Sequence, residues 1–302
     1  MPVEIEPART DEDLLEWAAV TNAIWRHDPL GREELREIES RMREPLFLVA
    51  RDGGAAVGAA FAGIEPGGEP TSRISVVTPA RGRGVGSTLL GELTAWAERR
   101  GLARLRAWAP FDDPDGVPWA LRRGFAEIGH ELVLALDLAN ADPPPAPLPE
   151  GVELVTLAER PDLLPALHRI GEETYRDVPG YEEEQPWPYV RWVETFMSGP
   201  THLPDAVFVA ADRGEPVGFA KAKPKLSAIG AAWNHYTGVR GEARGRGIGR
   251  ALKTAQIRWA QDAGFELLLT RNEERNAPIR HLNESLGYRP HSGRIRLERP
   301  LL

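Results

Sequence analysis

The sequence contains no cysteine, and its acidic residues outnumber its basic ones. The absence of cysteine excludes a disulfide framework, a cysteine nucleophile and any metal site built on thiolates. With 37 Lys and Arg against 45 Asp and Glu, the formal net charge is −8. Because a protein that neutralises nucleic-acid phosphates needs a basic surface, this charge argues against a dedicated nucleic-acid binder.

Long apolar runs are missing as well. No stretch of about 18 uncharged apolar residues occurs, so the sequence predicts no membrane span. Residues 1–17 are acidic and lack the apolar core of a secretory signal. At about one domain per 150 residues, the 302 residues predict two domains. We expect a soluble cytoplasmic protein, a monomer or homodimer, without a membrane, nucleic-acid or metal partner.

Proline is concentrated at one place near the middle of the chain. Residues 142–149 read Asp-Pro-Pro-Pro-Ala-Pro-Leu-Pro. Consecutive prolines exclude helix and ladder pairing and favour a stiff, extended spacer. We therefore expect an N-terminal domain over 1–140, a proline-rich linker over 141–150 and a C-terminal domain over 151–302.

A glycine-rich motif occurs once in each half, and the two copies are 163 residues apart. The copies are Arg81, Gly82, Arg83, Gly84, Val85 and Gly86, and Arg244, Gly245, Arg246, Gly247, Ile248 and Gly249. Each copy is preceded by a short strand, two helical segments and a hairpin with a following strand. A helix, a strand, a short helix and a final strand come after it. This repeated order predicts a duplication of one α/β fold.

The helices that follow the two motifs have apolar residues at spacings of three and four. These residues are Val85, Leu89, Leu93 and Trp96 in the first half, and Ile248, Leu252, Ala255 and Trp259 in the second. The predicted fold class is α/β with an α+β mixed sheet. Each of the two tandem domains is expected to be a mixed, mostly antiparallel sheet flanked by helices.

Alternating glycines between a strand and a helix suit a pyrophosphate site. They let the backbone approach a bulky anion, while the first helical amides and the helix dipole point at it. Neither copy has the Gly-Lys-Ser/Thr of an ATPase loop, and Ser87 and Arg250 replace the last glycine of a dinucleotide fingerprint. An RNA-binding segment would be disordered, whereas each copy enters an amphipathic helix. A plain glycine turn remains the alternative.

The run from Val239 to Gly249 resembles motif A of the GNAT superfamily of acetyl-CoA-dependent N-acetyltransferases, with Gly241 in place of the family's proline. The resemblance continues through Asn276, Leu282, Gly287 and Tyr288. It covers nearly the whole chain as two tandem domains, an organisation also seen in mycothiol synthases.

The resemblance implies a mechanism. The fourth and fifth strands splay apart around the pantetheine arm of acetyl-CoA or another acyl-CoA. Amides of Arg244–Gly249 hold the pyrophosphate, the main-chain amide near Val239 polarises the thioester carbonyl, and Asn276 lies beside the cofactor. A small-molecule primary amine then attacks directly, which requires a base and a donor for the departing thiolate.

The two halves do not match the family pattern equally well. In the first half the spacing from Pro79 to Arg81 is one residue short, and Asp113 occupies the asparagine position. We therefore expect the C-terminal domain to be catalytic and the N-terminal domain to be degenerate. The loop Arg81–Gly86 is kept as a second candidate cofactor site.

The general acid and base are less clear from the sequence. Asn283 stands where the family usually has its tyrosine acid, so Tyr288, another tyrosine or unassisted thiolate departure remain. His235, on the strand that enters the motif, is the first candidate for the base because imidazole titrates near neutrality; an ordinary strand histidine is the alternative. Glu172 and Glu173 are the second choice.

Candidate acceptor residues come from two places. Thr270 and Asn272 precede the second short helix, where they are alternatively turn or capping residues. Tyr175 and Asp177 begin an acidic, aromatic stretch over 175–184 that would attract a cationic amine, or that is simply a solvated loop. Alternating lysines at 221, 223 and 225 favour a protected edge strand over a phosphate or substrate contact.

Two functions follow from this pattern. The first is an N-acetyltransferase that moves an acetyl group from acetyl-CoA to a small-molecule amine. The alternative, suggested by Asn283, is a catalytically silent protein of the same fold that binds or senses acyl-CoA.

Overall fold

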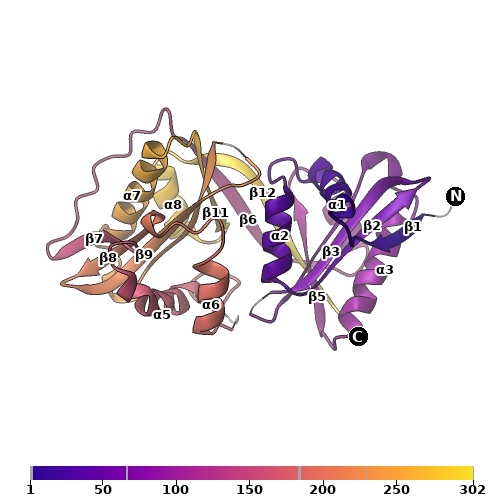
Figure 1. Cartoon of the computed structure of the whole chain (residues 1–302), viewed down its shortest axis with the longest axis horizontal. Helices are drawn as coiled ribbons and strands as arrows, with labels where there is room; N and C mark the ends of the chain where they lie inside the picture. Colours follow the sequence, from indigo (N-terminus) through magenta and orange to yellow (C-terminus); the bar gives the residue numbers. More distant parts are fainter. Residues whose placement is uncertain (1–2, 66, 183–184, 229, 302) are drawn as a thin grey trace. The chain divides into compact units, whose positions relative to one another are not determined.

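The computed structural model describes residues 3–65, 67–182, 185–228 and 230–301. The chain divides into two compact units (Figure 1). Unit 1 contains residues 1–130 together with 292–302, and unit 2 contains residues 131–291.

Unit 1 is built on strands β1–β4 with helices between them. Its elements are β1 (Glu4–Pro7), α1 (Asp11–Ile24), α2 (Arg32–Arg41), β2 (Arg43–Asp52), β3 (Ala55–Ile64), β4 (Pro70–Val76), α3 (Val85–Glu98), β5 (Arg104–Pro110) and α4 (Gly116–Leu121). Strands β1, β2, β3 and β4 form an antiparallel sheet in that order, and β5 pairs with β12 (Arg289–Pro300).

Unit 2 repeats the same order of elements. They are β7 (Val152–Thr156), α5 (Leu164–Tyr175), α6 (Tyr189–Phe196), β8 (Val207–Asp212), β9 (Glu215–Pro224), β10 (Ala231–Val239), α7 (Ile248–Asp262), β11 (Leu267–Glu273) and α8 (Ala277–Ser285). Together with β6 (Ala126–Asp137) the strands run β6-β11-β10-β9-β8-β7, and of these pairs only β10–β11 is parallel. The predicted fold class, a mixed and mostly antiparallel sheet flanked by helices, is confirmed.

The unit boundaries differ from the predicted boundaries at 140 and 151, because the last strand of each sequence half pairs in the other unit. β6 forms a ladder with β11 from Glu131 opposite Glu273 onward, and β12 forms one with β5. The proline-rich segment 141–150 therefore lies inside unit 2. Its start is fixed there, because Gln261 Nε2 donates to the carbonyl oxygens of Leu138 (3.0 Å) and Ala141 (2.9 Å).

Neighbouring strand residues point to opposite faces of each sheet, and helices cover both faces. In unit 1, Val49 packs in the core under α1, while Ala50 packs in the core under α3. In unit 2, Val209 packs in the core under α5, while Ala210 packs in the core under α7. The four apolar positions predicted for α3 are all buried, whereas Ala255 and Trp259 of α7 are only partly buried.

The lysine-rich strand does not lie at an edge. β9 pairs with β8 on one side and β10 on the other, and Lys221 is buried. The edge prediction is therefore wrong. The Lys221 ammonium instead donates to the carbonyl oxygen of Phe196 and lies 4.7 Å from the centroid of the Phe196 ring.

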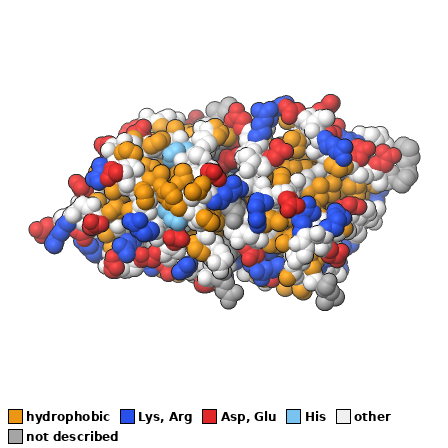
Figure 2. All heavy atoms as spheres, turned by 60° about the horizontal axis from the view of Figure 1, so that its bottom comes forward, with side chains coloured by type: hydrophobic (Ala, Val, Ile, Leu, Met, Phe, Trp, Pro, Cys, Tyr) orange, Lys and Arg blue, Asp and Glu red, His pale blue; other side chains and the backbone are white. Residues whose placement is uncertain are grey.

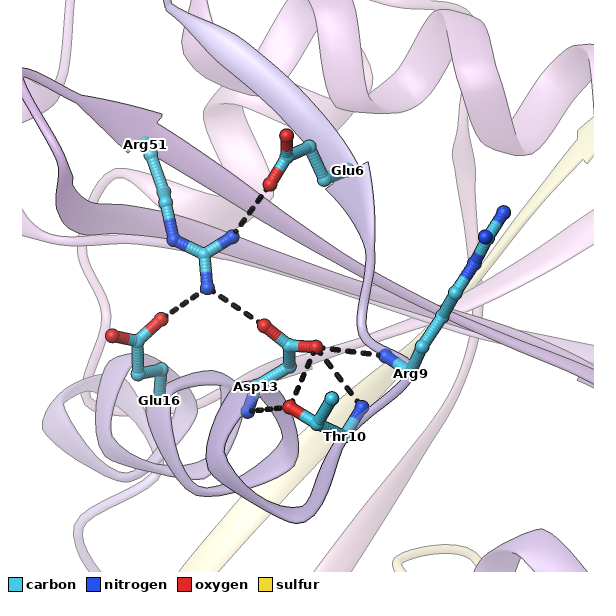
Figure 3. Close-up of polar contacts among 6 residues, drawn as sticks. All are labelled: Glu6, Arg9, Thr10, Asp13, Glu16 and Arg51. Carbon is cyan, nitrogen blue, oxygen red and sulfur yellow. Dashed lines mark hydrogen bonds and ion pairs between the residues drawn. The ribbon is translucent and has the colours of Figure 1, made fainter.

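Helix α1 begins with a capping box (Figure 3). The amide of Asp13 donates to Thr10 Oγ1 at 3.1 Å, and the Asp13 carboxylate accepts from the amides of Arg9 and Thr10, both at 3.0 Å. Hydrogen bonds from these amides hold the pKa of Asp13 well below its usual range. The Arg51 guanidinium also binds Asp13, which ties α1 to β2.

Within the part of the chain that the structure describes, no helix has both the length and the apolar character needed to cross a membrane.

Candidate functional site

The second glycine motif forms the turn between β10 and α7. A 3₁₀ turn over Gly241–Ala243 follows the strand, and Gly247 is the N-cap of α7. Gly247 has a φ of +85°, where any residue with a Cβ is strained. Apart from the glycine itself and its chain neighbours, no described atom lies within 4 Å of an ideal Cβ on Gly245 or Gly247, so the outer side of the turn is open; the same holds for Gly82 and Gly84 in the first loop.

The start of α7 presents backbone donors to this open side. The amide of Ala251 donates the first bond of the helix, to the Gly247 carbonyl at 3.1 Å. The amides of Ile248, Gly249 and Arg250 come before it and have no acceptor within the helix. Together with the positive end of the helix dipole, they provide the geometry that a diphosphate requires.

Arg244 and Arg246 frame the turn. The Nε atom of Arg244 donates to the Val239 carbonyl at 2.9 Å, and its guanidinium also binds Asp177. Arg246 Nη1 donates to Asp212 Oδ2 at 2.6 Å. Both arginine side chains are more than a third exposed, and exposed ion pairs contribute only about 0–1 kcal/mol. A diphosphate can therefore compete with the two carboxylates for these arginines.

Strands β10 and β11 separate just before this turn. They are parallel neighbours from Ala231 to Asn234 on β10. A β-bulge then lies between Asn234 and Tyr236, and the later residues of β10 that the structure describes pair with β9 only. The two strands therefore diverge toward their carboxyl ends, as the resemblance predicts.

The orientation of one backbone amide follows from this pairing. The amide of Arg240 donates to the Val217 carbonyl, on the β9 side, at 2.9 Å. Because successive amides of a strand point to opposite edges, the Val239 amide points away from β9, toward the side on which β11 diverges. This is the direction that a donor to a thioester carbonyl between the strands needs.

The first motif folds in the same way in unit 1. Gly84 is the N-cap of α3 with a φ of +88°, and Arg81 Nε donates to the Val76 carbonyl at 3.1 Å. Arg83 pairs with Asp52 at 2.6 Å. Each of these contacts has its counterpart in unit 2, so the duplication extends to the conformation of the loop.

The charges around the two loops differ. Arg81 Nη1 donates to Asp113 Oδ1 and to Asp115 Oδ2, both at 2.8 Å, and Nη2 donates to Asp113 Oδ2 at 3.1 Å. Two carboxylates thus occupy the arginine that begins the first loop. In unit 2 the corresponding arginine has one exposed carboxylate partner, so the first loop leaves less positive charge available to an anion.

The first turn of α3 is also covered. An ideal Cβ on Gly86 would lie 3.1 Å from the Trp119 ring. Arg123 stacks on the same ring, 4.2 Å from its centroid, and donates to Ser87 Oγ at 2.8 Å. In unit 2 an ideal Cβ on the equivalent Gly249 would meet a leucine methyl at 3.6 Å and a valine methyl at 3.9 Å, so its helix start is less tightly covered.

His235 occupies the bulge at which β10 leaves β11. Its side chain is exposed, and the centroid of its ring lies 5.1 Å from that of Phe196. This position is compatible with the predicted role of His235 as a base. Glu173 is less suitable, because it accepts from the amide of Gly241 and from Arg240 Nε, both at 3.0 Å. These contacts lower the pKa of Glu173 and make it the cap of the 3₁₀ turn.

Tyr288 and Asn283 are both fully buried. Burial raises the pKa of the Tyr288 phenol far above its usual value, and the nearby Asn234 amide offsets this only in part. A phenol in the core beside α7 is a poor proton donor to a thiolate between the strands. Asn283 Nδ2 donates to Asn272 Oδ1 at 2.6 Å, so these two predicted site residues contact each other inside the unit.

The remaining predicted residues are distributed around the site. Thr270 is buried on β11, and Asn276 is the N-cap of α8 with its amide donating to the Glu273 carbonyl at 3.0 Å. Asp177 binds the loop arginine. Tyr175 is 37% exposed and meets the Tyr181 ring edge-on, with the centroids 5.3 Å apart.

Of the acidic stretch 175–184, residues 183 and 184 lie outside the described residues. Figure 2 shows hydrophobic side chains gathered with histidines on one face of unit 2.

A buried lysine and a half-buried tyrosine of unit 2 were not identified by the sequence analysis. Lys253 is fully buried in α7, and this burial lowers its pKa to about 7. Burial raises the pKa of Tyr236 to about 12. Since Thr174 Oγ1 donates to the Ile170 carbonyl, Tyr236 is left to donate to Thr174. Helical periodicity alone did not signal Lys253, because it lies next to the apolar stripe of α7 rather than on it.

Comparison with known proteins gives the same picture. The acetyltransferase (GNAT) family model matches residues 12–125 and 164–288. A mycothiol acetyltransferase of Thermomonospora curvata is 28% identical over 283 residues, covering 92% of this chain and 91% of the relative. One from Thermobispora bispora is 31% identical over 247 residues, covering 80% of this chain and 79% of the relative.

Solved structures share the fold. A GCN5-related N-acetyltransferase from Sphaerobacter thermophilus matches with a TM-score of 0.78 and 21% identity, over 99% of this chain and 96% of that one. A tandem GNAT protein from the clavulanic acid biosynthesis pathway also has a TM-score of 0.78, at 22% identity, over 100% of this chain and 99% of that one.

The duplicated fold, with an open glycine turn at a helix start beside two diverging strands, is typical of an acyl-group transferase that uses a phosphate-bearing acyl donor. The chain belongs to the acetyltransferase (GNAT) family, in a tandem arrangement. It is an acetyltransferase of the acyl-CoA-dependent kind.

Proposed function

We propose that this protein transfers an acetyl group from acetyl-CoA to the primary amine of a small molecule, and that unit 2 alone carries the reaction. The observation that supports this most is the contrast between the two loops. In unit 2, Arg244 at the start of the loop has one exposed carboxylate partner, and an ideal Cβ on Gly249 would meet only methyl groups, at 3.6 and 3.9 Å. The loop of unit 1 has two carboxylates on Arg81 and a tryptophan over its helix start.

The residues present fit the donor. The free amides of Ile248 and Gly249, with Arg244 and Arg246, would hold the pyrophosphate, and the edge of β10 freed by the bulge would face the pantetheine arm. The bound donor supplies the activated thioester. The Val239 amide is directed so as to donate to its carbonyl and to stabilise the charge that develops there.

His235 is the proposed proton acceptor. An amine attacks only when it is unprotonated, and an exposed imidazole at the start of the divergence can take its proton directly or through water. Neither Tyr236 nor Tyr288 is placed as an evident acid, because the hydroxyl of Tyr236 is committed to Thr174 and Tyr288 lies in the core. We therefore propose that neither of these two phenols protonates the departing thiolate.

A matched pair of variants tests the proposal. Gly247→Asp and Gly84→Asp place the same carboxylate at the same N-cap in the two units. We expect Gly247→Asp to weaken acetyl-CoA binding in calorimetry by about tenfold or more, since it adds a charge worth at least about 1.4 kcal/mol at the phosphates. Gly84→Asp should leave the affinity within about twofold. Equal affinity of the Gly247→Asp variant and the unmodified protein would refute the proposed cradle.

A narrower candidate is a mycothiol acetyltransferase, the name of the relatives cited above. Identity of 28% over 92% of the chain supports this candidate. Release of thiol from acetyl-CoA with the acceptor of those relatives, compared with a panel of other primary amines, distinguishes the narrower candidate from the general one.

A further inference from the structure

A second polar cluster lies on the opposite side of β11 from α8. Along this strand Leu268 packs in the core with α7, and Asn272 reaches Asn283 on α8. Since neighbouring strand residues alternate, Arg271 and Glu273 point to the other face. The Arg271 guanidinium lies there over the Trp233 ring, 5.0 Å from its centroid. Trp233 is on β10, two residues before His235, so this face includes the part of β10 that leads to His235.

Two carboxylates meet on this face. Glu273 and Glu131 are directly opposite each other in the β11–β6 ladder, and they are only 4% and 7% exposed. Glu131 Oε1 accepts from the Tyr181 hydroxyl at 2.7 Å, and its Oε2 lies 3.8 Å from Arg271 Nε. Glu273 Oε1 accepts from Arg275 Nε at 2.7 Å. Opposite positions in an antiparallel pair bring two side chains close together on one side of the sheet.

One oxygen of this pair is unsatisfied. Glu273 Oε2 is buried and has no hydrogen-bond partner among the described residues. Like charges placed directly opposite destabilise a sheet, and a buried carboxylate oxygen without a donor adds to that penalty. Such groups in native proteins call for an explanation, and a bound partner is one of them. Arg271 and Arg275 offset part of the repulsion between the carboxylates, and a cationic guest that donates to Glu273 Oε2 would satisfy the oxygen that remains.

The pair suits a cation that does not react. A carboxylate beside an amine stabilises its protonated form, whereas the attacking nitrogen has to be unprotonated. A group held by Glu273 and Glu131 therefore stays an ammonium or guanidinium. Tyr181, which holds Glu131, comes from the segment that follows α5 and contacts Tyr175, a predicted acceptor residue.

We propose that Glu273, with Glu131 opposite it, is a subsite for a second, non-reacting cationic group of the acceptor. The acceptor class is then a diamine or another amine that carries an additional positive charge. This inference rests on the proposed acetyl transfer and adds a specificity element to it.

The test compares each of 1,3-diaminopropane, 1,4-diaminobutane and 1,6-diaminohexane with the monoamine of equal length, in a thiol-release assay with acetyl-CoA. We expect at least one diamine to have a KM about tenfold below that of its monoamine, as a charge-assisted hydrogen bond gives. Glu273→Gln should raise the KM of that diamine about tenfold and remove most of the advantage. The monoamine should change far less. A merely structural role would change both substrates together.

Glu274→Gln is the matched control, since Glu274 is the next residue and is exposed; it should preserve the diamine advantage. Glu131→Gln serves as a second variant if Glu273→Gln does not fold.

Calorimetric binding of the same diamines to protein loaded with CoA separates the two proposals, because it needs no turnover. Turnover without any diamine preference, or an equal loss for both substrates in Glu273→Gln, would overturn the subsite. Acetyl-CoA binding without turnover of any amine would instead contradict the proposed function, while the diamine titration would still decide on the subsite.

Discussion

At the scale of single residues, the site separates into an open side and a buried side. His235 lies at the bulge, on the exposed face, whereas Tyr288 and Asn283 lie inside. The sequence placed these residues near the site but could not predict whether they are buried, because their burial depends on which face of β11 and α8 packs against the core. Glu131 and Glu273 were not predicted at all. They are 142 positions apart, and only the strand register brings them together.

The first residue-scale prediction concerns His235. If its imidazole accepts the amine proton, His235→Ala should lower kcat/KM about a hundredfold or more near neutral pH and remove the acidic limb of the pH–rate profile. His281→Ala, at an exposed position of α8, is the control and should leave the profile intact. A limb that is unchanged in His235→Ala would show that another group is the base.

The second residue-scale prediction concerns Lys253. Its burial lowers its pKa to about 7 in the folded state, whereas in the unfolded chain it titrates near 10.5. Between these values the unfolded chain binds a proton that the folded protein does not, so the stability of the protein rises with pH across this window, by up to about 1.4 kcal/mol per pH unit. Below pH 7 the full penalty of the buried charge remains.

Lys253→Met removes this titration. Urea unfolding from about pH 6 to about pH 10 should show the variant to be the more stable protein at low pH, with a difference that shrinks as pH rises. A difference that stays constant across the range would contradict a titrating buried lysine.

At the scale of elements, the order of strands and helices was predictable, and the partners of the last strands were not. Hydrophobic periodicity and the repeated motif predict the order in each half, and the structure has it. The pairing of β6 with β11 and of β12 with β5 leaves no trace in periodicity, because either strand could complete either sheet. The duplication therefore repeats the local conformation of each half, whereas the final strand of each half pairs in the other unit.

The pairing of β6 and β12 in the opposite units predicts how fragments of the chain fold. Residues 1–140 alone carry β6 without β11 and have β5 without β12, so this fragment should have low helicity in circular dichroism and no cooperative melting. Residues 131–291 contain a whole unit and should fold. Cooperative unfolding of the 1–140 fragment as a monomer would contradict the importance of the exchanged strands.

At the scale of the whole molecule, two loops have the same conformation, and we propose that only the loop of unit 2 serves the reaction. The helix start of unit 2 is less tightly covered than that of unit 1, and the loop of unit 1 has its first arginine bound to Asp113 and Asp115. The sequence indicated this inequality through Asp113 and the shortened spacing before Arg81. It could not indicate the covering Trp119, since that contact depends on how α4 packs against α3.

The most direct test is a calorimetric titration of the full chain with acetyl-CoA, repeated with Gly247→Asp. We expect one acetyl-CoA site per chain and its loss in the variant. Two sites per chain, or one site that survives Gly247→Asp and disappears in Gly84→Asp, would contradict the assignment of the reaction to unit 2.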